Sequence, residues 1–264
     1  MATELSANTA TLNAPTAEYT INPKRQWLGL VVSGVLLLNF ACGAIAMLSS
    51  SGGGFAGAIF FLLLALPCGL WFRSILRNRD LRVQVLPDGL AITKHNETVS
   101  FRWADVTEVT QSIVKQYVNG AYIGTHHLYA VRLADQRRHT FNDAIRNVEE
   151  LGSIIQREAG RHILLRITQA YEAGQTVPFG PLSLSQNGIT RGNKALPWNQ
   201  VSCVDFDKGQ VVIYMKKDSY TLTDLVLSKG KGKKWASILI ARIPNALIFA
   251  AFANDIVSRT TTTP

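Results

Sequence analysis

The stretch "WLGLVVSGVLLLNFACGAIAML", residues Trp27–Leu48, decides the fold class of this chain, because it contains no charged side chain. A second uncharged stretch, "FAGAIFFLLLALPCGLWF", covers Phe55–Phe72, and only "SSSGGG" separates the two. A helix needs about 20 apolar residues to cross the hydrocarbon core of a bilayer. The sequence therefore predicts a transmembrane helical hairpin over residues 26–72, with spans at 27–48 and 55–72.

Two alternatives explain these stretches less well. A pair of buried core helices is the first, but helices of soluble proteins rarely run this far without a charge. A cleaved signal peptide is the second, and it needs a short basic segment directly before the apolar one. Here 25 mostly polar residues precede Gln26, where the uncharged stretch begins. The hairpin is therefore the favoured interpretation.

Basic residues flank the hairpin on both sides, and the turn between the spans carries no charge. The flanking cations are Lys24, Arg25, Arg73, Arg77, Arg79 and Arg82. Positive flanks stay on the cytoplasmic side of a membrane, and a hairpin returns both flanks to one side. The sequence therefore predicts a protein of the inner membrane with both termini in the cytoplasm. Residues 1–25 are rich in Thr, Ala and Asn, which predicts a disordered cytoplasmic tail.

The rest of the chain is basic. The formal net charge is +9, and residues 73–264 hold 25 basic against 16 acidic side chains. A basic region close to a bilayer attracts anionic lipid, and nucleic acid is the other common partner of a basic domain. The three cysteines, Cys42, Cys68 and Cys203, have no spacing typical of a metal site or a disulfide framework. The sequence predicts no metal, no cofactor and no catalytic residue.

Two β-rich segments follow the hairpin, and each ends in a helix. Apolar and polar residues alternate over residues 80–141, where Asn119-Gly120 in "YVNGAY" is a strong hairpin signal. Helical spacing then predicts a long bridging helix over residues 143–173. A second β segment begins at residue 177 and leads to "PNALIFAAFANDIV", which is too short to span a bilayer and predicts a buried core helix.

The two segments repeat a motif, W-x-x-V-x-x-V. It occurs once in "FRWADVTEV" at Trp103, Val106 and Val109, and again in "LPWNQVSCV" at Trp198, Val201 and Val204. We expect both tryptophans to be core anchors. About seven strands closed by one helix, twice over, is the arrangement of pleckstrin-homology-like (PH-like) domains. The predicted fold is α+β, with a helical hairpin before two tandem PH-like modules at residues 80–174 and 177–260.

The segments "DGL…FRWADVTEV", "YVNGAYIGTHHLY" and "ALPWNQV" resemble those of uncharacterised bacterial membrane proteins that carry PH-like domains behind a helical hairpin. The resemblance covers roughly residues 80–260, and its motifs are structural. It implies a fold and a membrane-associated role, and it brings no functional residues with it.

One candidate site stands out, the lysine-rich stretch "SKGKGKKW" that ends at Trp235. A phosphate-binding loop would need glycine at residue 227 and Ser or Thr at residue 234, and the chain has Leu227 and Lys234 there. A solvated hairpin tip, a contact with anionic lipid headgroups and a nucleic-acid contact remain, the last disfavoured because no aromatic platform accompanies it. The candidate lipid-contact residues are Lys229, Lys231, Lys233, Lys234 and Trp235.

The function predicted from these features is non-enzymatic. We expect a membrane-anchored scaffold or binding protein at the cytoplasmic face, in contact with a protein partner or anionic lipid. One alternative is an accessory subunit of a membrane enzyme or transporter, with a pocket between the modules lined by Tyr117, Tyr122 and His127. The other is a membrane-tethered nucleic-acid binder, which the sequence disfavours.

Overall fold

The computed structural model describes residues 15–49, 55–77, 79–216 and 232–262. The chain divides into two compact units. The first comprises residues 1–101 and 143–148, and the second comprises residues 102–142 and 149–264.

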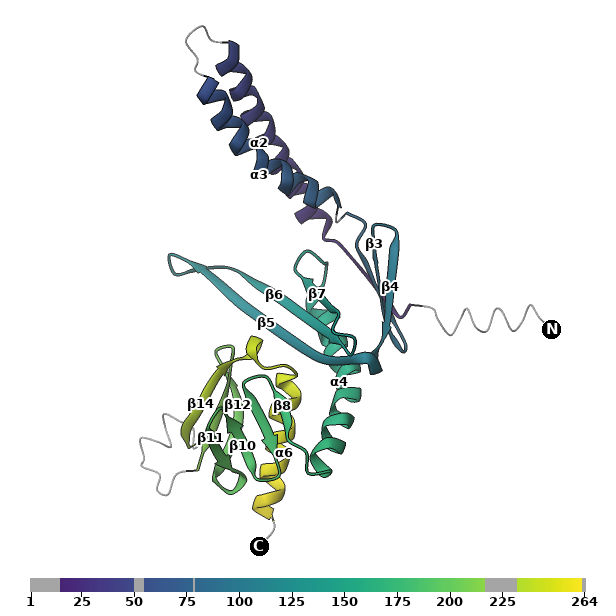
Figure 1. Ribbon diagram of the computed structural model, residues 1–264, viewed down its shortest axis with the longest axis vertical. Helices are drawn as coiled ribbons and strands as arrows, with labels where there is room; N and C mark the ends of the chain where they lie inside the picture. Colours follow the sequence, from purple (N-terminus) through teal and green to yellow (C-terminus); the bar gives the residue numbers. More distant parts are fainter. Residues whose placement is uncertain (1–14, 50–54, 78, 217–231, 263–264) are drawn as a thin grey trace, which may run out of the picture. The chain divides into compact units, whose positions relative to one another are not determined.

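The first unit contains the predicted helical hairpin, formed by α2 (Pro23–Ser49) and α3 (Phe55–Arg77) (Figure 1). The two helices pack closely through small residues: a Cβ added at Gly43 would lie 2.9 Å from the ring of Phe61. Only 11% and 6% of their most apolar windows are buried, so their outer faces are apolar and exposed. Both helices are long and apolar enough to cross a membrane. They extend beyond the predicted spans to include flanking basic residues.

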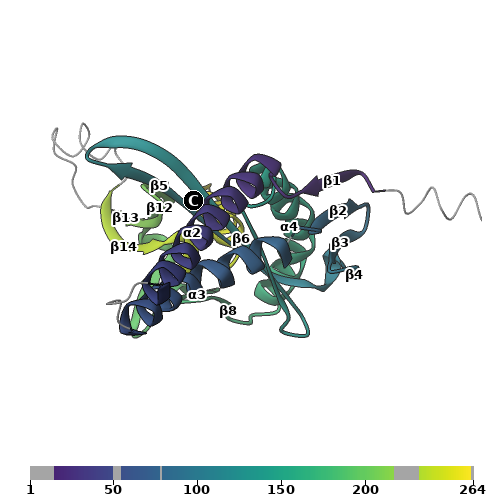
Figure 2. The same cartoon turned by 90° about the horizontal axis from the view of Figure 1, so that it is seen from above.

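A short strand precedes the hairpin and belongs to the sheet that follows it. Strand β1 (Ala17–Thr20) pairs antiparallel with β2 (Arg82–Leu86), and the sheet order is β1-β2-β3-β4 (Figure 2). The other two strands are β3 (Gly89–Lys94) and β4 (Glu97–Arg102). The prediction of a disordered tail over residues 1–25 is therefore wrong for residues 17–25, because Tyr19 is buried against this sheet. Residues 1–14 lie outside the described part of the chain.

The segment just before the long helix is tied to the base of the hairpin. The backbone N–H of Asn22 donates to the carbonyl of Ala144 at 2.7 Å, and that of Arg146 donates to Thr20 at 2.8 Å. The Arg25 guanidinium donates to the carbonyl of Asp143 at 3.0 Å. The predicted helix over residues 143–173 therefore begins later, at α4 (Val148–Glu172). Its first predicted turn is wrong because these residues bond to the chain around β1.

The second unit begins with a three-stranded antiparallel sheet. It contains a 3₁₀ turn, η1 (Trp103–Asp105), then β5 (Val106–Val118), β6 (Ala121–Leu133) and β7 (Arg138–Asn142). Asn119 and Gly120 both have positive φ, so the predicted β5–β6 turn is confirmed. Helix α4 carries a buried apolar stripe and continues through Gly160. The stripe comprises Leu151, Ile155, Ala159, Ile163 and Ile167.

The rest of the second unit repeats the order of elements found from β1 to α4, without a helical hairpin. Four strands form one sheet, a 3₁₀ turn follows, three strands form a second sheet, and a helix closes the segment. The elements are β8 (Val177–Phe179), β9 (Leu182–Ser185), β10 (Gly188–Arg191), β11 (Lys194–Pro197), η2 (Trp198–Gln200), β12 (Val201–Asp207), β13 (Gln210–Met215), β14 (Lys233–Leu239), η3 (Ile240–Arg242) and α6 (Ala246–Thr262). Helix α6 is the predicted core helix, because Phe249 and Ala253 are fully buried.

The repeated motif lies at equivalent places in the two copies. Trp103 and Trp198 each open a 3₁₀ turn and are 2% and 5% exposed, so both are core anchors as predicted. The first copy counts seven strands only when β1 is included, and α2 and α3 lie between its first and second strands. The fold is thus α+β, with an apolar helical hairpin and antiparallel sheets.

Candidate functional site

Trp235 occupies an irregular position in the last strand. Ala236 pairs with Ile213 and Lys234 pairs with Tyr214, so Trp235 is the extra residue of a β-bulge in β14. Bulges change the direction in which a side chain points and are common beside functional sites. Trp235 is half-buried. The bulge therefore gives this indole a direction that regular pairing would not give.

A hollow of about 660 Å³ lies beside Trp235 and is lined by Arg191, Asn193 and Lys194 from the β10–β11 turn. Arg191 and Lys194 are direct cross-strand partners, and like charges placed opposite each other destabilise a strand pair. Neither forms an ion pair within the described residues. An anion held between the two cations would relieve their repulsion while the indole contacts its apolar part.

The predicted lysines fall partly into this region. Lys233 and Lys234 are exposed on β14 beside Trp235, whereas Lys229 and Lys231 lie outside the described residues. Sequence reasoning missed Arg191 and Lys194. The signal available was the Gly192-Asn193 turn between two cations, about 40 residues before Trp235 in the chain.

A second basic hollow, of about 530 Å³, lies where β5, β6 and β7 meet η3. Its cations are Arg132, Arg138 and Arg242, and Thr110 lines it as well. This hollow contains its own counter-charge, because Glu108 lies 3.5 Å from the guanidinium of Arg132. It also lacks an aromatic residue. The hollow at Trp235 is therefore the better candidate for an amphiphilic anion.

An apolar groove of about 360 Å³ separates β5 from α4 and the start of α6. Its polar groups are Asn245 and the hydrogen-bonded pair of Gln111 and Gln156. Tyr117, Tyr122 and His127, expected to line such a pocket, do not line it. The two tyrosine rings pack edge to face at 5.8 Å near the β5–β6 turn, and His127 contacts Glu149 of α4 at 2.6 Å.

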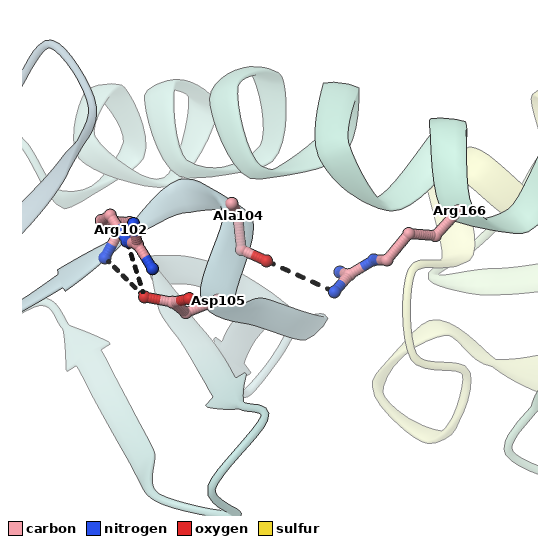
Figure 3. Close-up of polar contacts among 4 residues, drawn as sticks. All are labelled: Arg102, Ala104, Asp105 and Arg166. Carbon is pink, nitrogen blue, oxygen red and sulfur yellow. Dashed lines mark hydrogen bonds and ion pairs between the residues drawn. The ribbon is translucent and has the colours of Figure 1, made fainter.

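Charged residues fix the 3₁₀ turn that carries Trp103 (Figure 3). The carboxylate of Asp105 accepts hydrogen bonds from the backbone N–H and the side chain of Arg102, at 3.3 and 3.4 Å. From α4, the Arg166 guanidinium donates to the carbonyls of Ala104, at 3.4 Å, and Val106. These contacts cap the turn against the helix, so their role is structural.

The family comparison matches residues 1–262, which include the hairpin and both copies of the repeat, to a family of unknown function, DUF6585. The chain belongs to this family. No curated protein matches it significantly.

Among the residues that the structure describes in this DUF6585 chain, no three His, Cys, Asp or Glu side chains gather as a metal site would require. His126 and His127 are adjacent in β6 and pair with Val114 and Ile113, so they point to opposite faces of the strand. At the Trp235 hollow, the described residues offer cationic and apolar contacts.

Proposed function

We propose that this protein is a membrane-anchored, non-enzymatic binding protein whose second module contacts anionic phospholipid headgroups. The helical hairpin anchors it in the inner membrane. The two β-rich copies are PH-like modules on the cytoplasmic side. The hollow at Trp235, Arg191 and Lys194 is the headgroup contact.

The pairing of β1 with β2 supports the proposed topology. Thr20 and Arg82 are cross-strand partners, so the chain entering α2 and the chain leaving α3 lie side by side. If both helices cross the bilayer, both ends of the hairpin are on one face. Lys24, Arg25 and Arg77 lie at those ends, and positive flanks favour the cytoplasmic face.

The order of elements supports the PH-like interpretation. In the second copy, a four-stranded sheet β8–β11 precedes a three-stranded sheet β12–β14, and α6 closes the segment. The first copy follows the same order once β1 is counted as its first strand. Fold alone does not define function, and the residues that support a ligand are those of the hollow at Trp235.

The single observation that carries the proposed ligand is the position of Trp235. The bulge places its indole beside two cations that repel each other and have no carboxylate partner among the described residues. A lipid headgroup offers a phosphate for the cations and an acyl boundary for the indole, which favours membrane interfaces. Each cation near an anionic surface contributes about 1 kcal/mol.

Native mass spectrometry of the full chain, released from micelles containing equal phosphatidylglycerol and phosphatidylcholine, tests this proposal. The variant Arg191→Ala/Lys194→Ala/Trp235→Ala should lose about 2 kcal/mol from its two cations, roughly a 30-fold loss of affinity for phosphatidylglycerol. Arg138→Ala/Arg242→Ala removes the same charge from the other basic hollow and should keep the lipid. Equal retention by both variants would contradict the proposal.

An oligonucleotide competitor addresses the nucleic-acid alternative in the same experiment. Nucleic-acid binding falls steeply with salt because counterions are released. Displacement of phosphatidylglycerol by a single-stranded oligonucleotide would favour that alternative. Retention of the lipid in its presence would support the headgroup contact.

A further inference from the structure

The β5–β6 hairpin extends well past the third strand of its sheet (Figure 1). Strand β7 pairs with β6 only from Leu128 to Arg132. Beyond that point residues 113–127 form a two-stranded ribbon, here called the arm. The arm has no third strand among the described residues.

The base of the arm is held firmly. Tyr129 is buried, and its ring lies so close to Gly152 of α4 that a Cβ there would approach within 2.3 Å. His127 contacts Glu149, and Gln111 bonds to Gln156, also on α4. The tip therefore projects from a rigid base.

The tip of the arm exposes large apolar side chains on both faces. Consecutive residues of a strand point to opposite sides, and two consecutive pairs are exposed beside the turn. Their exposed fractions run from 52% to 60%, and the pairs are Tyr117-Val118 and Tyr122-Ile123. A protein partner that packs on one face would leave the other in water, whereas a bilayer surrounds the tip on every side. Exposed apolar surface of this kind marks an interaction site.

The charge of the arm agrees with a bilayer as its occupant. No acidic residue occurs between Glu108 and Asp135, and Lys115 lies within the arm. The two tyrosines flank the turn, and tyrosine is enriched at the membrane–water interface because its ring is apolar and its hydroxyl is polar. An acid-free ribbon with a basic residue is complementary to an anionic surface.

We infer that the tip of the arm, residues 117–123, inserts into the interfacial layer of an anionic bilayer and forms a membrane contact separate from the helical hairpin. The insertion is shallow, because the edges of a two-stranded ribbon carry unpaired backbone groups that hydrocarbon does not tolerate. Amphipathic elements at this boundary reach about 5–10 Å into it. The contact is independent of Trp235 and of the function proposed for its hollow.

The test uses the full chain in nanodiscs of phosphatidylcholine and phosphatidylglycerol. Cys42, Cys68 and Cys203 are changed to Ala, and Val118→Cys carries an environment-sensitive fluorophore. Gln136→Cys, in the exposed β6–β7 turn of the same sheet, carries it in a matched sample. We expect a blue shift and quenching by nitroxide-labelled lipid at residue 118, and neither at residue 136.

Two results would overturn the inference. If the label at residue 118 shows the same emission and the same lack of quenching as the label at residue 136, the tip remains in water. A blue-shifted label that lipid nitroxides do not quench, together with disulfide cross-linking of Val118→Cys between protomers, would show that a second copy covers the tip.

A second variant distinguishes insertion of the tip from nonspecific adsorption through other exposed apolar surface. Changing Tyr117, Val118, Tyr122 and Ile123 to Ser, read through a label at Asn119→Cys, should abolish the blue shift while circular dichroism stays unchanged. Leu164→Ser/Leu165→Ser removes exposed apolar surface from α4 instead, and there the blue shift at residue 119 should persist. Persistence in the first variant would also contradict insertion.

Discussion

Asn245, at the start of α6, closes the edge of β5 by bonding to Val109 with both its backbone and its side chain. Its N–H donates to the Val109 carbonyl at 2.8 Å, and its Oδ1 accepts from the Val109 N–H at 2.8 Å. Asn254 bonds to Val204 with its side chain alone: its Oδ1 accepts from the Val204 N–H at 2.9 Å, and its Nδ2 donates to the Val204 carbonyl at 2.8 Å. Val109 and Val204 are the equivalent valines of the repeated motif. Asparagines at the start of α6 and within it therefore bond to an edge strand of each copy, β5 and β12.

The Asn245 contact predicts a site-specific loss of protection. Asn245 has φ +55°, so Asn245→Gly removes the side chain without backbone strain. The part-buried Val109 N–H then loses its partner, which costs about 1–3 kcal/mol. Hydrogen exchange should accelerate around Val109 and stay slow around Val204. Asn254→Ala should instead accelerate exchange around Val204 and leave it slow around Val109. The same pattern in both variants would mean that the two asparagine contacts are not independent.

Two glycines of α4 predict opposite responses to the same substitution. A Cβ at Gly152 would lie 2.3 Å from the buried Tyr129 ring, whereas at Gly160 the nearest atom, from Ile248, is 3.8 Å away. Gly152→Ala should destabilise by about 1–3 kcal/mol through overpacking. Gly160→Ala should stabilise by up to about 1 kcal/mol, because alanine is the better helix former. Thermal unfolding in micelles measures both, and equal shifts would contradict the packing described.

The pairing of β1 with β2 predicts that the helical hairpin is removable. Replacing residues 23–79 with a short glycine-containing turn should give a soluble folded protein, because Thr20 and Arg82 are already neighbours. A chain that starts at residue 80 should be less stable, because it lacks β1 and the buried Tyr19. Losing one large buried side chain costs about 1.5–3 kcal/mol. Denaturant unfolding compares the two, and equal stability would mean that β1 contributes nothing.

His139 on β7 predicts a pH dependence of stability. Burial lowers its pKa from the ordinary 6.5, the neighbouring Arg137 lowers it further, and Asp135 opposes the shift less strongly. The unfolded chain therefore takes up the proton first, so this contribution is complete above pH 6.5 and is lost as the pH falls through the folded pKa. His139→Gln should flatten the fall in Tm below pH 6.5. Parallel curves for the two proteins would refute it.

Much of the architecture follows from local sequence signals. The absence of charge over residues 26–72 predicted the helical hairpin, and the motif at Trp103 and Trp198 predicted two buried anchors. Asn119-Gly120 predicted the tight turn of the arm. Each signal lies within a few consecutive residues, where periodicity and turn chemistry are informative.

The missed features depend on contacts between distant residues. Strand β1 is only four residues long, and its partner β2 lies about 60 residues later, beyond the hairpin. Arg191 and Trp235 lie on strands of two different sheets, and no local pattern encodes how those two sheets approach each other. The alternation that predicted β5 and β6 could not show that, among the described residues, no third strand covers their tips.

The helical hairpin lies between two strands that pair with each other, β1 and β2. Pairing of these strands in the first copy of the repeat would therefore depend on correct insertion of the hairpin into a bilayer. If both helices cross a bilayer as proposed, β1 is synthesised before them and can pair with β2 only after both have crossed. If one helix failed to cross, β1 and β2 would be separated by the hydrocarbon layer, about 30 Å thick, and could not pair. A wrongly threaded chain would thus present an open sheet edge, the kind of surface that quality-control proteases and aggregation act upon.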